Sequence, residues 1–332
     1  MSEIKNTIKA KKIKAGAQIR VIAPARSLKL LSDTGKNDAI ERLEKFGFKL
    51  SFGKHVDEMD EFSSSSVASR IEDLHDAFAD RDVDAILTVI GGYNSNQLLE
   101  YINYDLIAKN PKIICGFSDI TALNNAITAK TGLITYIGPH FSSWGMKHGF
   151  EYSMEGFIKS CMEDEGYDLT PSVEWSDDPW YMDQEKRDFI KNDGYWVLHP
   201  GYALGRIVGG HVRCLNALQG TAYWPGLDES ILILEEDYEI NPQLFDRQLQ
   251  SLIHQLDFGG VKGILIGRFQ KATKMTRELL EKIIREKKEL NDIPIIANVD
   301  FGHTTPLATM PIGGSLEIIA KDGVAKIRII EH

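Results

Sequence analysis

The sequence has little of what marks secreted or membrane-spanning proteins. It contains only three cysteines, Cys115, Cys161 and Cys214, with no CxxC spacing, so no disulfide framework is expected and the thiols should be reduced. Its longest apolar runs, such as 86–90 and 231–234, are far too short to span a bilayer. The lysine-rich start of the chain has no apolar segment of the kind that a secretory signal requires. We therefore expect a cytoplasmic protein without a membrane partner.

The common signatures of metal and nucleotide sites are also missing. There is no HExxH, no clustered pair of Cys and His, and no Asp-rich calcium loop, so no metal is expected. The dinucleotide fingerprint G-x-G-x-x-G and the Walker lysine are absent. Basic residues are outnumbered, with 38 Lys and Arg against 48 Asp and Glu and a net charge of −10. Because phosphate binding needs clustered Lys and Arg, this balance argues against nucleic acid as the main partner.

What remains is ordinary globular composition, 43% hydrophobic and 26% charged over 332 residues, enough for two domains. In the first half, β-branched runs alternate with segments whose apolar residues recur at helical spacing. This alternation predicts βαβ units, hence a mostly parallel sheet with helices on both faces and ligands beyond the carboxyl ends of the strands. The expected strands are 18–23, 48–52, 84–90, 112–115 and 133–137.

The second half begins after an acidic, aromatic stretch between about 162 and 200 that lacks periodicity. Long insertions of this kind are usually functional or disordered, so it is interpreted as a linker and substrate loop containing the domain boundary. Beyond it the pattern predicts strands, helices and a closing hairpin. The strands are 203–210 and 230–235, the helices 241–256 and 274–290, and the hairpin 315–320 with 324–330.

The sharpest local motif is Gly116-Phe117-Ser118-Asp119, which joins an apolar strand directly to a helical pattern. This is the layout of a nucleophile elbow, in which a serine is exposed above the sheet beside helix N-terminal amides. Those amides, including that of Asp119, could stabilise an oxyanion. The match to G-x-S-x-G is incomplete because Ile120 occupies the second glycine position. The alternative is that Ser118 and Asp119 only cap the helix.

A second motif, Gly91-Gly92, ends another strand before a helix. Glycine there allows the backbone to approach a ligand closely, so the pair could supply a second oxyanion donor or hold substrate. The alternative is a turn that caps the helix and needs glycine for a positive φ.

A serine nucleophile needs a base, and the base needs an orienting carboxylate. His303 is favoured because it follows the apolar run 293–299 at a turn that contains glycine. His254 lies inside a helical pattern, while His140, His199 and His211 remain alternatives near strand ends.

Glu235 ends the strand SILILE, where its side chain shares a face with Ile231 and Ile233. Burial of a carboxylate is costly unless it is paired, which suits the orienter of a histidine. A solvated acidic strand end is the alternative interpretation.

Taken in order, the motifs resemble the LD-carboxypeptidase and microcin-immunity family of serine peptidases. The similarity runs from about Lys14 to Pro311. The segments that carry it are KAGAQIRVIAPARS, IGGYNSNQLL, CGFSDITAL, GRIVGGHVRCLNALQGTAYWP, LILEE and DFGHTTP.

The resemblance implies a flavodoxin-like N-terminal domain that carries the nucleophile and a smaller mixed α/β C-terminal domain that carries Glu and His. We assign these to residues 1–165 and 203–332, with 166–202 as the linker and substrate loop. It also implies a homodimer, no cofactor and no metal.

Residue by residue, Ser118 matches the family nucleophile, Glu235 the orienting carboxylate and His303 the base. The separation of 68 residues between the last two favours Glu235 over Glu236. Gly92 and Asp119 match the backbone oxyanion donors, and Gly91 lies beside the substrate.

The glycine loop distinguishes two branches of the family. Cell-wall-recycling LD-carboxypeptidases usually carry GGYG there, whereas GGYN in this sequence resembles the microcin-immunity branch, which confers antibiotic resistance. That branch cleaves an acyl bond in peptide-nucleotide antibiotics or aminoacyl-adenylate analogues. Trp180 resembles the aromatic residue that stacks on adenine, with Tyr181 and Trp196 as rivals and a packed aromatic as the alternative.

Several features remain open. His211 departs from the Asn common in the recycling enzymes, and Lys186 with Arg187 marks a basic patch in the substrate loop. A muropeptide LD-carboxypeptidase and a non-catalytic nucleotide-binding module stay as alternative functions.

Overall fold

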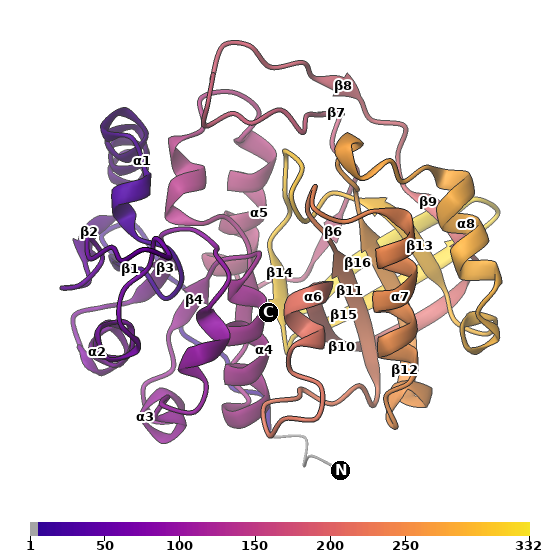
Figure 1. The fold of residues 1–332 in the computed structure, drawn as a ribbon, viewed down its shortest axis with the longest axis horizontal. Helices are drawn as coiled ribbons and strands as arrows, with labels where there is room; N and C mark the ends of the chain where they lie inside the picture. The colour runs from indigo at the N-terminus through magenta and orange to yellow at the C-terminus, as the bar shows by residue number, and fades with distance from the viewer. Residues whose placement is uncertain (1–5) are drawn as a thin grey trace.

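Two β-sheets lie side by side in the computed structural model, which describes residues 6–332 (Figure 1). A hairpin of two short strands arches over the top of both sheets in this view. No helix in residues 6–332 is long and apolar enough to cross a membrane.

The first sheet has the strand order β14-β5-β4-β3-β1-β2, and its five N-terminal strands are all parallel. This is the order of flavodoxin-like sheets, so the predicted α/β fold of the first half is confirmed. The strands are β1 (Gln18–Ile22), β2 (Lys49–Phe52), β3 (Ala85–Thr88), β4 (Ile113–Cys115) and β5 (Thr135–Ile137). The helices are α1 (Asp33–Lys45), α2 (Val67–Ala79), α3 (Tyr104–Lys109), α4 (Ile120–Thr131) and α5 (Glu151–Cys161).

The local sequence explains where α2 begins and which of its residues are buried. Ser66 begins the helix because its hydroxyl accepts a hydrogen bond from the Ser69 amide. Leu74 and Phe78, one turn apart, are both fully buried. Burial of such side chains stabilises the fold by roughly 1.5–3 kcal/mol each. Leu74→Ala would therefore cost about 2–5 kcal/mol of stability.

The sixth strand of this sheet comes from the far end of the chain. β14 (Met310–Ile312) pairs antiparallel with β5. The sequence analysis missed it, because three residues that include a proline do not form a recognisable strand pattern. Its consequence is that residues just after His303 are tied to the sheet that carries Ser118.

The second sheet is mixed, with the order β6-β16-β15-β10-β11-β12-β13-β9. Its central strands are parallel and its edge strands antiparallel. The strands are β6 (Tyr167–Leu169), β9 (Trp196–His199), β10 (Gly201–His211), β11 (Ser230–Glu235), β12 (Val261–Gly267), β13 (Ile295–Val299), β15 (Ser315–Lys321) and β16 (Val324–Glu331). The helices are α6 (Val212–Asn216), α7 (Pro242–Ile253) and α8 (Arg277–Arg285). The expected hairpin is confirmed as β15 and β16.

Two segments differ from expectation in extent. The helix expected over 274–290 is shorter, because the chain tightens into a separate 3-10 turn after α8. The segment 166–202 holds the hairpin β7 (Glu174–Trp175) with β8 (Ile190–Lys191), but its ends also supply β6 and β9 to opposite edges of the second sheet. The 3-10 turns are Leu28–Leu30, Ser95–Leu98, Phe141–Gly145, Phe258–Gly260, Lys271–Thr273 and Lys288–Leu290.

The two sheets meet where α4 docks on the end of β10. The Asn125 side chain donates to the Gly209 carbonyl at 2.8 Å and accepts from its amide at 3.2 Å. The His211 amide donates to Thr121 Oγ1 at 3.0 Å. Gly210 permits this approach, because a Cβ there would lie 2.6 Å from Thr121 Oγ1. The start of α4 is thus brought against the carboxyl ends of β10 and β11.

Candidate active site

Ser118 lies at the sharp turn between β4 and α4. Its backbone φ is +61°, in the left-handed region that residues with a side chain seldom adopt. Such strain at a strand-to-helix turn is typical of a nucleophile elbow, because it lifts the hydroxyl above the sheet. Glycine is required at position 116, where a Cβ would overlap the Thr88 hydroxyl. The turn therefore has the conformation of an elbow although Ile120 replaces its second glycine.

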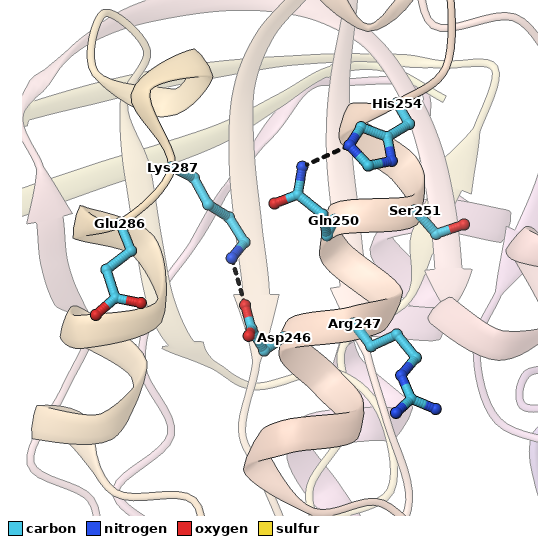
Figure 2. A pocket seen from close by; sticks show the side chains of 7 residues that line it. All are labelled: Asp246, Arg247, Gln250, Ser251, His254, Glu286 and Lys287. Carbon is cyan, nitrogen blue, oxygen red and sulfur yellow. Dashed lines mark hydrogen bonds and ion pairs between the residues drawn. The ribbon is translucent and has the colours of Figure 1, made fainter.

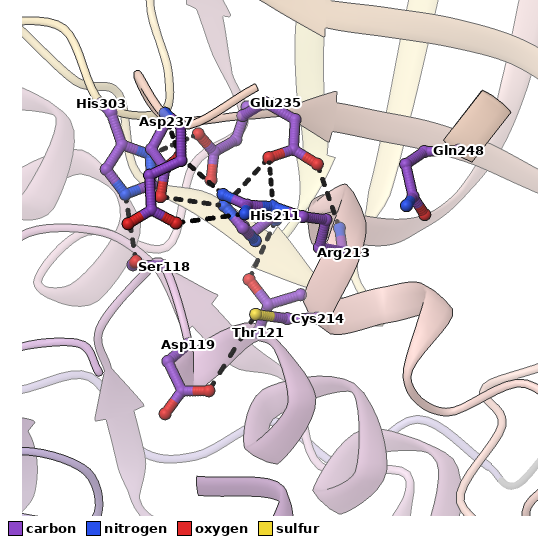
Figure 3. A network of polar contacts seen from close by, with 12 residues as sticks. Ser118, Asp119, Thr121, His211, Arg213, Cys214, Glu235, Asp237, Gln248 and His303 are labelled. Atoms are coloured by element: carbon purple, nitrogen blue, oxygen red, sulfur yellow. Dashed lines mark hydrogen bonds and ion pairs between the residues drawn. The ribbon is translucent and has the colours of Figure 1, made fainter. Parts of the chain in front are cut away.

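The structure brings His303 and Glu235 to Ser118 from the second sheet (Figure 3). His303 Nε2 lies 3.0 Å from Ser118 Oγ, and His303 Nδ1 lies 2.7 Å from Glu235 Oε2. Gly302 allows this contact, because its φ is +106° and a Cβ there would lie 2.6 Å from Glu235 Oε2. The hydroxyl, the imidazole and the carboxylate thus form one continuous chain of polar contacts.

Glu235 is buried, with 1% of its surface exposed, as strand parity predicts. It ends β11, whose six residues are all buried. One carboxylate oxygen contacts His303, and the other has no hydrogen-bond partner among the described residues.

The remaining histidines separate clearly once their surroundings are known. His254 is exposed at the end of α7. His199 lies on the edge strand β9 of the second sheet and contacts the Leu290 carbonyl. His140 is buried against the Phe117 ring, with centroids 4.3 Å apart, and Phe117 in turn lies 5.3 Å from His303. Burial, with smaller contributions from His303 and Arg26, lowers the pKa of His140 to about 3.

His211 is the alternative histidine that reaches the site. Its ring lies 5.4 Å from that of His303, and its Nε2 lies 3.2 Å from Glu236 Oε2. Burial disfavours the charged imidazolium, but contacts with Asp237 and the charge of Glu235 outweigh it and raise the pKa of His211 well above its usual range. His211 therefore pairs with Glu236 and Asp237 beside His303 rather than with Ser118.

The sequence analysis missed the ion-pair network around His211. Arg213 contacts Glu236 at 3.0 Å, Asp237 at 2.6 Å and Glu239 at 3.2 Å. The run Glu235-Glu236-Asp237 after an apolar strand was the available signal, since buried acids need partners. Two groups of side chains in this region have the residue types of a metal site, with possible ligand atoms within 4.8 Å of one another. One group is His211, Glu235 and His303, and the other is His211, Glu236 and Asp237. In both sets the carboxylates already contact the cationic or imidazole groups described above.

Asp119 follows Ser118 and occupies the N-cap position of α4, yet its side chain makes no cap bond to that helix. The interpretation of Asp119 as a simple helix cap is therefore wrong. Its carboxylate turns instead to the glycine loop, defined here as residues 91–95, and accepts from the amides of Asn94 and Ser95.

A cavity of about 170 Å³ opens beside Ser118. The glycine loop, the start of α4 and the ion-pair network surround it. Its lining residues are Gly92, Tyr93, Asn96, Ser118, Asp119, Ala122, His211, Arg213, Cys214, Ala217 and Asp237. Gly91 packs directly on Ser118, because a Cβ at Gly91 would lie 2.9 Å from Ser118 Cβ.

A larger cavity of about 540 Å³ lies between α7 and the end of α8 (Figure 2). Its walls are polar side chains of the helices, among them Gln250 and His254, which lie 3.0 Å apart. No residue of the Ser118 chain of contacts lines it. Size alone therefore does not make it the candidate active site.

The three aromatic residues considered for stacking on adenine, Trp180, Tyr181 and Trp196, do not line the 170 Å³ cavity. Trp180 is half-buried and packs against the core of the first sheet, with the exposed Tyr181 ring 6.1 Å from its own. Trp196 belongs to β9 and donates to Asp193. Arg187 donates to the His148 carbonyl, so this part of the predicted basic patch joins the loop to the first domain.

The segment 166–202 is also attached to the chain close to His303. Ser176 and Thr305 exchange backbone hydrogen bonds of 2.8 and 2.7 Å, two residues beyond His303. Trp175, just before Ser176, lies 5.2 Å from the Arg268 guanidinium and 5.5 Å from Lys271 Nζ. A movement of this loop would therefore reach the turn that carries His303.

Hydrolases that use an activated serine have this arrangement, in which a serine hydroxyl, an imidazole and a buried carboxylate contact one another in series. Comparison with known proteins specifies the class. Residues 19–138 match the LD-carboxypeptidase N-terminal domain of peptidase family S66, and residues 204–318 match its C-terminal domain. The chain therefore belongs to the S66 family of LD-carboxypeptidases, and it is a carboxypeptidase-type hydrolase.

Among curated relatives, YocD of Bacillus subtilis (strain 168) is 51% identical over 97% of this chain and 99% of its own. The microcin C7 self-immunity protein MccF of Escherichia coli is 31% identical over 84% of this chain and 83% of its own. The murein tetrapeptide carboxypeptidase of Pseudomonas aeruginosa is 27% identical over 89% of this chain and 91% of its own.

Solved structures agree. An MccF-like protein from Bacillus anthracis superposes with a TM-score of 0.97 at 51% identity, covering 98% of this chain and all of that one. MccF in complex with glutamyl sulfamoyl guanosine superposes with a TM-score of 0.88 at 29% identity, covering 97% and 98%. The expected fold and family are thus confirmed.

Proposed function

We propose that this protein is a serine carboxypeptidase of the microcin-immunity type, which cleaves an amide bond in peptide-nucleotide antibiotics or aminoacyl-adenylate analogues. The observation that carries the proposal is the chain of contacts from Ser118 Oγ through His303 to Glu235, at 3.0 and 2.7 Å. The nucleotide-like substrate is supported by relatives, because MccF has been solved with glutamyl sulfamoyl guanosine bound.

In the proposed reaction Ser118 attacks the scissile carbonyl while its proton passes to His303 Nε2. Glu235 accepts the Nδ1 proton in a hydrogen bond, which fixes the tautomer and stabilises the imidazolium. The tetrahedral oxyanion is held by the amides of Gly92 and Asp119, and His303 then returns the proton to the departing amine. Water, activated by the same imidazole, releases the acyl group from Ser118.

The cavity beside Ser118 offers the place for the acyl group, with Gly91 and Gly92 at its edge. Trp180 is proposed to stack on the base after movement of the substrate loop. No metal or other cofactor is needed for these steps. The proposal includes a cytoplasmic homodimer, which sedimentation and cell fractionation would check.

The muropeptide LD-carboxypeptidase remains the second candidate, favoured by the murein tetrapeptide carboxypeptidase among the relatives. One comparison separates the two. The purified protein is incubated in parallel with aspartyl sulfamoyl adenosine and with a muropeptide tetrapeptide that ends in D-Ala, and both products are followed by chromatography. Faster turnover of the nucleotide analogue is expected. Turnover of the tetrapeptide alone would assign the protein to cell-wall recycling.

Ser118→Ala tests the chemistry itself. The variant should lose at least about 10³-fold in kcat, because it lacks the nucleophile. Its circular dichroism spectrum should be unchanged. If Ser118→Ala hydrolyses either substrate at the wild-type rate, the serine mechanism is wrong. If nucleotide analogues bind but are not hydrolysed by the wild-type protein, the third candidate, a non-catalytic nucleotide-binding module, replaces it.

A further inference from the structure

The glycine loop has no strand or helix of its own at Gly91 and Gly92, which lie between β3 and the short 3-10 turn Ser95–Leu98. The proposed function nevertheless needs the Gly92 amide at a fixed place, since an oxyanion donor is effective only when it is held before the charge develops. Some other part of the protein must therefore hold this loop against Ser118.

The Asp119 carboxylate is bonded to the loop on the side that faces the nucleophile. Its Oδ2 accepts hydrogen bonds from the Asn94 amide at 3.0 Å and the Ser95 amide at 2.9 Å. In return, Ser95 Oγ donates to the Asp119 carbonyl at 2.8 Å. Three hydrogen bonds thus join the residue after the nucleophile to the residues just after Gly92.

Two arginines also hold the glycine loop. Arg26 Nε donates to the Gly91 carbonyl at 3.1 Å, and Arg70 Nη1 donates to the Asn94 carbonyl at 3.0 Å. Side chains of three residues, Arg26, Arg70 and Asp119, therefore bond to the backbone of the glycine loop. Of these groups, only Asp119 is covalently adjacent to the nucleophile.

Asp119 is buried, so its carboxylate is held in place by the hydrogen bonds to the glycine loop rather than by solvent. Only 4% of the residue is exposed, and desolvation raises the pKa of its carboxyl although the hydrogen bonds from Ser95 and Asn94 oppose that rise. Its other oxygen lies 4.0 Å from Cys214 Sγ. An apolar residue would avoid the desolvation cost, but it would leave the buried Ser95 amide and the partly buried Asn94 amide without this acceptor.

We propose that Asp119 is a positioning residue whose side chain holds the Gly92 amide at the distance from Ser118 that oxyanion binding requires. The inference rests on the proposed function, because it assumes that Ser118 is the nucleophile and that Gly92 is an oxyanion donor. It concerns the carboxylate of Asp119, whereas the proposed mechanism uses only the backbone amide of that residue.

The test compares Asp119→Ala with Asp119→Asn and with Asp73→Ala as a matched control. Asp73 is also 4% exposed and also accepts from a loop amide, that of His55, but it lies on α2 away from Ser118. Rates are divided by the fraction of active sites that react with a fluorophosphonate. Asp119→Ala should lose about 10²- to 10³-fold in kcat, the usual effect of removing one oxyanion donor.

The other readouts separate positioning from stability. KM of Asp119→Ala should stay within about threefold, because the oxyanion forms only in the transition state. Asp119→Asn retains an oxygen that can accept both amides, so its kcat should recover to within about tenfold of wild type. Asp73→Ala should lower the urea midpoint but leave kcat unchanged.

Two results would overturn the inference. One is a kcat for Asp119→Ala within threefold of wild type, and the other is a kcat for Asp119→Asn as low as that of Asp119→Ala. If Asp119→Ala does not fold, Asp119→Ser, whose shorter side chain cannot bond both loop amides as the carboxylate does, takes its place, and a kcat within threefold of wild type would have the same meaning. Failure of the proposed function is distinct, because it would appear as full activity in Ser118→Ala.

Discussion

Replacement of Glu235 by glutamine should remove most of the activity while preserving the shape of the site. Glu235 is 1% exposed and lies 2.7 Å from His303 Nδ1. In the proposed mechanism His303 becomes an imidazolium in the transition state, and the carboxylate stabilises that charge. A glutamine retains the size of the side chain but carries no charge, and it can present its amide nitrogen to Nδ1 and so favour the wrong tautomer.

The magnitude follows from the geometry. With charge centres about 4 Å apart and an effective dielectric constant of about 20, the attraction is about 4 kcal/mol. At 1.36 kcal/mol for each factor of ten, this corresponds to a loss of about 10³-fold in kcat.

The assay is steady-state hydrolysis of the preferred substrate by the wild-type, Glu235→Gln and Glu236→Gln proteins, with urea unfolding as the check on folding. Glu236 is a matched control, because it is equally buried and adjacent, but it contacts Arg213 and His211 rather than His303. Its variant should keep kcat within about fivefold. A folded Glu235→Gln protein whose kcat is within tenfold of wild type would refute the role assigned to this carboxylate.

Three further predictions concern other parts of the structure. Gly91→Ala should lower kcat about 10²-fold, because the new Cβ would lie 3.0 Å from Ser118 Oγ and displace it; Gly259→Ala, which meets nothing within 4 Å, is the control. In the folded protein the pKa of His140 is lowered to about 3, whereas in the unfolded chain it is 6.5. Below pH 6.5 only the unfolded chain takes up this proton, so the free energy of unfolding falls by about 1.4 kcal/mol for each pH unit. Between pH 7 and 4.5, the free energy of unfolding in urea should therefore fall by about 2–3 kcal/mol less for His140→Asn than for the wild-type protein. An equal fall in both proteins would contradict this. Burial raises the pKa of Cys161 to about 12, so brief alkylation of the native protein should leave it unmodified in a peptide map, and rapid labelling would disprove the burial.

Several features could be predicted from the sequence because they depend on neighbouring residues. Helical spacing and β-branched runs are local signals, and they predicted the parallel strands β1 to β5 and the hairpin of β15 with β16. The elbow at Ser118 follows from a strand that meets a helix at a glycine. The face that Glu235 shares with Ile231 and Ile233 pointed to its burial, with a solvated strand end as the alternative, but the equal burial of Glu236 on the other face was not predicted.

Other features were decided only by the packing of the two sheets. Five histidines were candidates for the base, and the choice of His303 depends on contacts with Ser118 and Glu235, which lie 185 and 68 residues away in the chain. The same packing placed His211 beside the carboxylates of Glu236 and Asp237. No local pattern encodes such contacts, because they exist only once docking of α4 on β10 has brought the ends of β4 and β11 together.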